Sequence, residues 1–344
     1  MVKRLGRTEA LKLLKEASLL ELGERADALR KKLHPRPLVT FVIDRNINYT
    51  NVCVSGCRFC AFSRPPGHPE SYTLGFDQIF EKIEELLAAG GTQILMQGGL
   101  NPELDLDWFE SLFRLIKKNY PIHIHSLSPP EIDFLARKEG LSLKQTLLRL
   151  KRSGLDSIPG GGAEILSERV RKKLSPKKIG VSGWLRVMKE AHRLDLSTSA
   201  TMMFGSIEKD EDLIAHLLQI RKLQDETQGF ISFIPWSFQP KNTGLSELAP
   251  ASGVRYLKIL ALSRLVLDNI PNLQASWVTQ GAKIAQVSLF FGANDFGSTM
   301  LEENVVAAAG ASFRLSQAEI VRLIKEAGFL PAQRDQKYRI LTKF

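Results

Sequence analysis

The 344-residue sequence contains only three cysteines, and all three lie within a span of eight residues. An odd number of cysteines at such short spacing excludes a framework of structural disulfides and does not suit a secreted protein. A four-cysteine zinc site is also excluded, because the sequence has no fourth cysteine. Cys53, Cys57 and Cys60 are therefore predicted to bind a ligand or to react.

Long apolar runs are missing as well. No stretch reaches the roughly 18 apolar residues that a membrane-spanning helix needs. The first residues also lack the apolar stretch and small-residue cleavage site of a secretory signal. We therefore expect a cytoplasmic protein without a membrane partner, and its 44% of hydrophobic residues suffices for a large buried core.

Acidic residues are outnumbered, with 37 Asp and Glu against 47 Lys and Arg, which gives a net charge of +10. The excess is concentrated in residues 1–36, 144–178 and 322–343, which have helical patterning and few interleaved aromatics. Solvated helix faces account for such segments better than a polyanion site, so we expect no nucleic-acid partner. A basic surface of this kind would also suit an acidic electron donor.

Apolar runs of strand type alternate with amphipathic helical stretches along the chain. Strands are predicted at residues 39–49, 92–97, 122–127, 155–158, 197–204, 230–236, 273–278 and 293–296. Helices are predicted at residues 8–33, 77–89, 106–119, 182–193, 210–224, 254–269 and 316–327. Eight strands alternating with helices indicate an α/β fold, a (β/α)8 TIM-type barrel whose active site lies at the carboxyl ends of the strands.

Three regions follow from this pattern. Residues 1–37 form an N-terminal helical extension, residues 38–312 form the barrel, and residues 313–344 form a closing helix and an irregular or strand-like tail. No chemistry can be assigned to the tail from its sequence. Glycines at 98–99, 160–162, 205 and 292 follow or flank strands, either as ordinary turns or as points where backbone approaches a ligand.

The three cysteines have the spacing C-x3-C-x2-C, which lets three thiolates converge in one loop after the first strand. Soft thiolates select zinc, copper(I) or iron–sulfur clusters. Zinc with His68 as a fourth ligand stays open, and with it a zinc-containing RNA-binding protein. An iron–sulfur cluster held by three cysteines would instead leave one iron free to bind S-adenosylmethionine (SAM).

The cysteine motif, with Phe59 in its aromatic position, resembles that of the radical SAM superfamily. The resemblance implies a 4Fe-4S cluster and SAM as cofactors. It also implies SAM contacts from Gly98 and Gly99, although Leu100 replaces the usual following Glu. Further SAM-contacting residues implied by the resemblance are Glu164, Gly205 and Glu208, with a helix cap or a solvated side chain as the alternative role of Glu164.

Longer stretches are similar to cyclic dehypoxanthine futalosine synthases of menaquinone biosynthesis, among them DRNINYTNVC (44–53), GGTQILMQGGLNP (90–102) and LDSIPGGGAEIL (155–166). The resemblance implies that a 5′-deoxyadenosyl radical takes hydrogen from C4′ of the substrate ribose. The carbon radical then adds to the benzoate ring, and loss of an electron and a proton restores aromaticity. A flavodoxin or ferredoxin is implied as electron donor. Aminofutalosine synthases and radical SAM synthases of deazaflavin precursors are the alternatives.

Such a reaction requires a base for the ring proton and a partner for the substrate carboxylate. Asp295, at the end of the eighth predicted strand, and His125, at the end of the third, are the candidate catalytic residues. Each also has an ordinary structural interpretation, in a turn for Asp295 and as a hydrogen-bonded barrel histidine for His125. Candidate carboxylate partners are Arg45, Arg64 and Lys283.

Overall fold

Strands and helices alternate along the chain in the computed structural model, which describes residues 4–311 and 313–344. Seven strands form a parallel sheet in chain order. They are β2 (Asp44–Ile47), β3 (Gln93–Met96), β4 (His123–Ser126), β5 (Ser157–Ile158), β6 (Ser197–Phe204), β7 (Phe230–Ser237) and β8 (Asn272–Leu273). Because the strands are parallel, the loops that follow them meet at one rim.

The remaining side of the barrel is made by β1 (Leu38–Val42) and β9 (Asp295–Ser298), which pair in parallel. β1 runs directly into β2, and a single bridge from Gln274 to Asp295 joins the end of β8 to β9. Counting β1 and β2 as one position, eight positions surround the interior. The predicted α/β barrel is confirmed.

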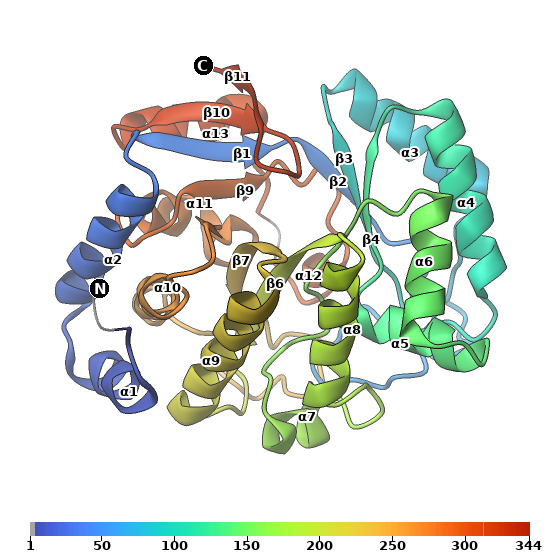
Figure 1. Cartoon of the computed structure of the whole chain (residues 1–344), viewed down its shortest axis with the longest axis horizontal. Helices are drawn as coiled ribbons and strands as arrows, with labels where there is room; N and C mark the ends of the chain where they lie inside the picture. The colour runs from blue at the N-terminus through green and yellow to red at the C-terminus, as the bar shows by residue number, and fades with distance from the viewer. Residues whose placement is uncertain (1–3, 312) are drawn as a thin grey trace.

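Helices cover the outside of this barrel (Figure 1). In chain order they are α3 (Phe76–Ala88), α4 (Leu106–Asn119), α5 (Pro129–Lys138), α6 (Leu143–Ser153), α7 (Glu168–Leu174), α8 (Val181–Arg193), α9 (Asp210–Thr227), α10 (Gly253–Val266) and α11 (Trp277–Ser288). The short helix α12 (Val305–Ala308) instead faces the interior, where Val305 and Val306 line the cavity. α4 shows why such segments are helical. Its apolar residues Phe109, Leu112, Phe113 and Ile116 recur at helical spacing and are buried, and Asp105 caps its first turn by accepting Trp108 N–H at 2.9 Å.

Two strand predictions fail for tertiary reasons. The strand predicted at 39–49 is interrupted at Ile43, because β1 pairs with β9 while β2 pairs with β3. The strand predicted at 273–278 ends at Leu273, and Trp277 instead begins α11. The Trp277 indole N–H donates to Ser298 O at 2.9 Å, so this apolar run enters the core from a helix.

The two ends of the chain pack against the barrel. Helices α1 (Arg7–Glu16) and α2 (Leu19–Leu33) lie beside α9 and α10, and Arg4 pairs with Asp225 and Asp268. After α13 (Gln317–Glu326), β10 (Leu330–Arg334) pairs in parallel with β1, and β11 (Ile340–Lys343) returns antiparallel. The division at residues 37/38 and 312/313 stays a prediction, and its bounds at residues 1 and 312 lie outside the described residues.

None of the helices within residues 4–311 and 313–344 combines the length and apolar character that crossing a bilayer requires.

Histidines are buried as neutral groups in this core. His192 of α8 bonds Thr227 Oγ1 at 2.7 Å and Thr198 Oγ1 at 2.8 Å, and burial lowers its pKa to about 4. His216 of α9 accepts Leu166 N–H at 3.0 Å, and burial lowers its pKa to about 3. Between pH 6.5 and 4 the unfolded chain therefore binds protons that the folded chain does not.

We expect the free energy of unfolding to fall as the pH drops from 7 to 4.5, with His192 responsible for about 2 kcal/mol of the loss. His192→Gln retains an amide that can bond both threonines but does not titrate. Over the same pH range, the free energy of unfolding of this variant should therefore fall by about 2 kcal/mol less than that of the wild-type protein. Urea unfolding at both pH values measures the difference, and equal losses in the two proteins would contradict the assignment.

Candidate active site

The three cysteines lie on the loop between β2 and α3, at the rim formed by the carboxyl ends of the strands. Backbone hydrogen bonds hold this loop in place. Cys53 N–H donates to Arg64 O at 2.8 Å, and Cys60 N–H donates to Cys57 O at 3.2 Å. Gly56 has φ +58°, a left-handed conformation that favours glycine and lets the chain turn between the first two cysteines. The predicted position of the motif after the first barrel strand is confirmed.

The sulfur atoms of this loop have hydrogen-bonding neighbours. Leu100 N–H donates to Cys53 Sγ at 3.3 Å, and Ser55 Oγ lies 2.9 Å from Cys53 Sγ and 3.3 Å from Cys57 Sγ. Burial raises the pKa of the Cys57 thiol, and the nearby Lys178 charge opposes that shift. Deprotonation of Cys57 is thus favoured by a cation, whether a lysine or a bound metal.

The glycine pair after β3 packs directly against the cysteine loop. A Cβ on Gly99 would lie 2.1 Å from Val52 O, and a Cβ on Gly98 would lie 2.6 Å from the Tyr49 ring. Any side chain at Gly98 or Gly99 would therefore displace neighbouring atoms. The pair sets the distance between β3 and the loop that carries Cys53.

A buried carboxylate that the sequence analysis missed fixes this glycine pair. Glu131 of α5 accepts Gly98 N–H at 3.0 Å and Tyr49 O–H at 2.6 Å, and it also accepts Ser128 N–H at 2.7 Å. Burial raises its pKa, while these hydrogen bonds oppose the shift. The capping-box pattern Ser128-x-x-Glu131 was the available signal, since it predicts a carboxylate bonded to the backbone at the start of a helix.

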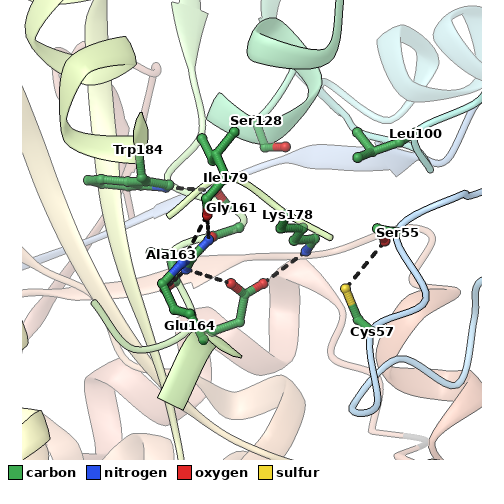
Figure 2. Close-up of polar contacts among 12 residues, drawn as sticks. Ser55, Cys57, Leu100, Ser128, Gly161, Ala163, Glu164, Lys178, Ile179 and Trp184 are labelled. Atoms are coloured by element: carbon green, nitrogen blue, oxygen red, sulfur yellow. Dashed lines mark hydrogen bonds and ion pairs between the residues drawn. The ribbon is translucent and has the colours of Figure 1, made fainter. Parts of the chain in front are cut away.

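Glu164 lies across the rim from the cysteines, in the loop after β5 (Figure 2). It is 6% exposed and accepts from Lys178 Nζ at 3.0 Å and from Arg171 Nη1 at 3.2 Å. Burial raises the pKa of Glu164, but the charges of Lys178 and Arg171 lower it by more than burial raises it. The carboxylate is therefore ionised at neutral pH. Figure 2 shows the Lys178 ammonium between Glu164 and the loop that carries Ser55 and Cys57.

Lys178 and Arg171 are therefore site residues that the sequence analysis did not identify. The Lys178 Nζ atom lies 5.2 Å from the centre of the Phe59 ring, so the aromatic residue of the cysteine motif faces a cation. Burial lowers the pKa of Lys178, but the Cys57 and Glu164 side chains raise it more. The signal was the basic segment 144–178, which looked like a solvated helix face.

The turn after β6 contains the other predicted SAM-contacting residues. Gly205 has φ +92°, and its N–H donates to Glu208 Oε1 at 2.5 Å. Ser206 N–H donates to Glu208 Oε2 at 2.9 Å. Glu208 thus shapes the turn through its own backbone contacts, while its contact with SAM stays a prediction.

A cavity of about 300 Å³ fills the interior of the barrel and is lined by residues of β1 to β4, β6, β7 and β9 and by the segments that follow β5 and β8. His125 of β4 is in its wall, and its Nδ1 atom lies 2.6 Å from Ser157 Oγ. Burial lowers the pKa of His125 well below its usual value, so the imidazole is neutral at pH 7. A neutral imidazole in a cavity wall can accept a proton.

Asp295 differs from its predicted placement. β9 begins at Asp295 instead of ending there, so this residue lies at the amino end of its strand and not at the rim. Its carboxylate is fully buried and accepts from Thr40 Oγ1 at 2.5 Å, Gly297 N at 2.9 Å and the Arg334 guanidinium. It is absent from the described lining of the cavity.

The candidate carboxylate partners face elsewhere. Arg45 pairs with Glu85 and Glu302, Arg64 pairs with Glu70, and Lys283 is exposed on α11. The described cavity lining contains none of the three. Arg334, Gln336 and Tyr338 of the C-terminal tail line the cavity instead, in the segment to which the sequence had assigned no chemistry.

Comparison with known proteins decides the family. Residues 47–220 match the radical SAM superfamily, and residues 227–343 match the CofH/MqnC C-terminal region. This chain belongs to the radical SAM superfamily. It is thus an enzyme that uses a 4Fe-4S cluster together with SAM, as its cysteine motif implied.

Relatives of this radical SAM enzyme include members of two named groups. A cyclic dehypoxanthine futalosine synthase of Halalkalibacterium halodurans is 47% identical over 343 residues, which cover 99% of this chain and 93% of the relative. Its counterpart in Streptomyces coelicolor is 42% identical and covers 97% and 85%. A 5-amino-6-(D-ribitylamino)uracil–L-tyrosine 4-hydroxyphenyl transferase of Methanocaldococcus jannaschii is 40% identical and covers 98% of each chain.

The crystal structure of methylornithine synthase has a TM-score of 0.76 to this radical SAM enzyme, at 20% identity, and covers 96% of this chain and 95% of its own. This similarity confirms the fold and carries no information on the substrate.

The site of this radical SAM enzyme fits the cluster by its donor chemistry. Three thiols lie on one loop, the Leu100 N–H donates to the sulfur of Cys53, and the Ser55 hydroxyl lies within hydrogen-bond distance of it, as polar groups do around cluster-ligating thiolates. Among the described residues, no three His, Cys, Asp or Glu side chains are arranged to hold a single metal ion. Cys53, Cys57 and Cys60 would hold the cluster, and the assignment of these ligands stays a proposal.

Cys57→Ala is expected to lose more than nine tenths of the bound iron, because two thiolates cannot retain the cluster. Its far-UV circular dichroism should stay unchanged, since the loop lies at the rim and outside the core. Iron analysis after anaerobic reconstitution checks this, with Val54→Ala as the control because that side chain on the same loop is exposed. Iron retained by the Cys57 variant at the control's level would contradict the ligand assignment.

Proposed function

We propose that this radical SAM enzyme cyclises dehypoxanthine futalosine to cyclic dehypoxanthine futalosine in menaquinone biosynthesis. The observation that carries the proposal is the 47% identity, over nearly the whole of both chains, to a protein of that name. The cavity supports it, since its volume of about 300 Å³ lies in the range of small-molecule sites, and its wall combines apolar and polar side chains.

When bound, the cluster and SAM supply the 5′-deoxyadenosyl radical that takes hydrogen from C4′ of the substrate ribose. The residues proposed to hold SAM are Phe59, Gly98, Gly99, Glu164, Gly205 and Glu208. Glu164 is kept ionised by Arg171 and Lys178, so its carboxylate can accept hydrogen bonds from ribose hydroxyls. Arg171 also donates to Ala163 O at 2.7 Å, which fixes the loop on which Glu164 lies.

His125 is proposed as the acceptor of the ring proton. Ser157 Oγ lies 2.6 Å from His125 Nδ1 and 2.7 Å from His123 Nε2, so the single hydroxyl proton can go to only one imidazole. If Ser157 donates to His123 and accepts from His125 Nδ1–H, the Nε2 lone pair of His125 stays available for the substrate. Asp295, whose carboxylate is bonded by several donors, is proposed to position Arg334 and not to act as the base.

A basic surface beside the cysteine loop is proposed to bind an acidic electron donor such as flavodoxin or ferredoxin. Arg58 N–H donates to Leu174 O at 2.9 Å, which joins the cysteine loop to the end of α7. The exposed side chains of Arg58, Lys172, Lys173 and Lys177 lie around this junction. Positive charge next to the proposed cluster ligands would attract an acidic protein and shorten the path of the electron.

The decisive assay is anaerobic incubation of the reconstituted enzyme with dithionite, SAM and dehypoxanthine futalosine. We expect 5′-deoxyadenosine and cyclised product together by mass spectrometry. The competing function, suggested by the relatives named as 4-hydroxyphenyl transferases, is tested in parallel with 5-amino-6-(D-ribitylamino)uracil and L-tyrosine. Product from that pair alone would replace the proposed function.

Reversing charge in the double variant Lys172→Glu/Lys173→Glu is expected to slow flavodoxin-driven turnover about tenfold at low salt, because electrostatic steering is lost. Dithionite-driven turnover should be unchanged, since dithionite needs no docking surface. Lys31→Glu/Lys32→Glu, at the end of α2, introduces the same charge change elsewhere and is the matched control. Equal slowing in both double variants, or slowing with dithionite, would contradict the docking surface.

A further inference from the structure

The C-terminal tail closes the end of the cavity opposite the cysteine loop. β10 pairs with β1, and Figure 1 shows it at the top of the view, with α7 and the rim at the bottom. The chain then turns back, with Asp335 N–H donating to Arg339 O at 3.0 Å and Tyr338 in a left-handed conformation at φ +60°. This turn directs Arg334, Gln336 and Tyr338 into the cavity wall.

Arg334 is the one Arg or Lys among the described residues that line the cavity. Its Nε and Nη2 atoms bond the two oxygens of Asp295 at 2.5 and 3.1 Å, and Nη1 donates to Asp335 O at 3.2 Å. These contacts use three of the five N–H donors of the guanidinium. The Tyr338 ring lies 3.9 Å below the guanidinium carbon, so Arg334 is held in one orientation.

Two buried polar atoms of this cavity wall have no hydrogen-bond partner among the described residues. They are Gln93 Oε1 and the Tyr338 hydroxyl, which has Ser232 of β7 as a polar neighbour in the same wall but no hydrogen bond of regular geometry. The Gln93 amide N–H is already directed to Asp44 Oδ2 at 3.0 Å, so its orientation is set. Buried polar groups are almost always bonded, and orphaned ones in a cavity wall indicate a ligand that supplies the missing partners.

The unpaired groups define the chemistry of that ligand. A remaining Arg334 N–H and the Tyr338 O–H are the available donors. The guanidinium charge is paired with Asp295, but its N–H groups still form charge-assisted hydrogen bonds, which suit a carboxylate. Gln93 Oε1 is an acceptor and suits a hydroxyl group. We propose that Arg334 and Tyr338 bind the carboxylate of the substrate and that Gln93 accepts a hydrogen bond from one of its hydroxyls.

This inference rests on the proposed function, whose substrate carries a benzoate and ribose hydroxyls. It places the substrate with its carboxylate away from the rim, so the tail selects acids over neutral analogues. Asp295 acts as a positioning residue, because its two oxygens and the contacts from Thr40 and Gly297 hold the guanidinium in place.

Tyr338→Phe tests the site with little risk to folding, because it removes an unpartnered hydroxyl and keeps the ring beneath Arg334. We expect the KM for dehypoxanthine futalosine to rise about tenfold, which corresponds to the loss of one hydrogen bond to a charged group. The change in kcat should be much smaller. The preference for the acid over its primary amide should fall by a similar factor. Tyr120→Phe is the matched control, since its hydroxyl bonds Glu84 on the surface.

The double variant Arg334→Gln/Asp295→Asn removes both charges without leaving either one unpaired, and it should lose the acid preference altogether. Calorimetric binding of the acid and the amide provides a readout independent of turnover. An unchanged acid-to-amide ratio in Tyr338→Phe and in the double variant, in enzyme that converts the acid, would overturn this inference alone. A wild-type enzyme that neither binds nor converts the acid would overturn the proposed function and the inference with it.

Discussion

The parallel direction of the barrel strands is the constraint on which the site depends. Because β2 to β8 are parallel and follow one another in chain order, the loops after them converge at one rim. Cys53, Gly99, Glu164 and Gly205 are far apart in the sequence and meet there. The absence of side chains on Gly98 and Gly99 lets the cysteine loop lie directly on the end of β3. A different strand order would separate these groups.

Charge is buried at both ends of the cavity. At the rim, Glu164 is matched by Arg171 and Lys178, and at the opposite end Asp295 is matched by Arg334. Removing such charges from water costs several kcal/mol, and a buried ion pair recovers little net stability compared with apolar packing. We therefore interpret both clusters as oriented groups for ligands. We interpret the cluster at the rim as serving the cofactor and the cluster at the tail as serving the substrate.

The structure shows how the glycine pair is supported although Leu100 stands where a Glu is expected. Leu100 still contributes its backbone N–H to Cys53 Sγ, so the position keeps a role that does not depend on its side chain. A carboxylate is nevertheless present beside the glycine pair, since Glu131 reaches Gly98 from α5. The local motif therefore differs from the usual one, while the neighbourhood of the glycine pair still contains a buried acid.

The sequence by itself determined the barrel, the position of the cysteine loop and the family, because each depends on local pattern. Hydrophobic periodicity sets strands and helices such as β6 and α4, and the cysteine spacing is a local signal for a cluster. It could not place Asp295, whose strand begins two residues later than its apolar run indicated. It also could not identify Lys178, Arg334 or Tyr338 as site residues, and for Glu131 it offered only a capping-box pattern. Their roles arise from partners that the fold brings together across the barrel, and such long-range pairings leave no periodic trace in the chain.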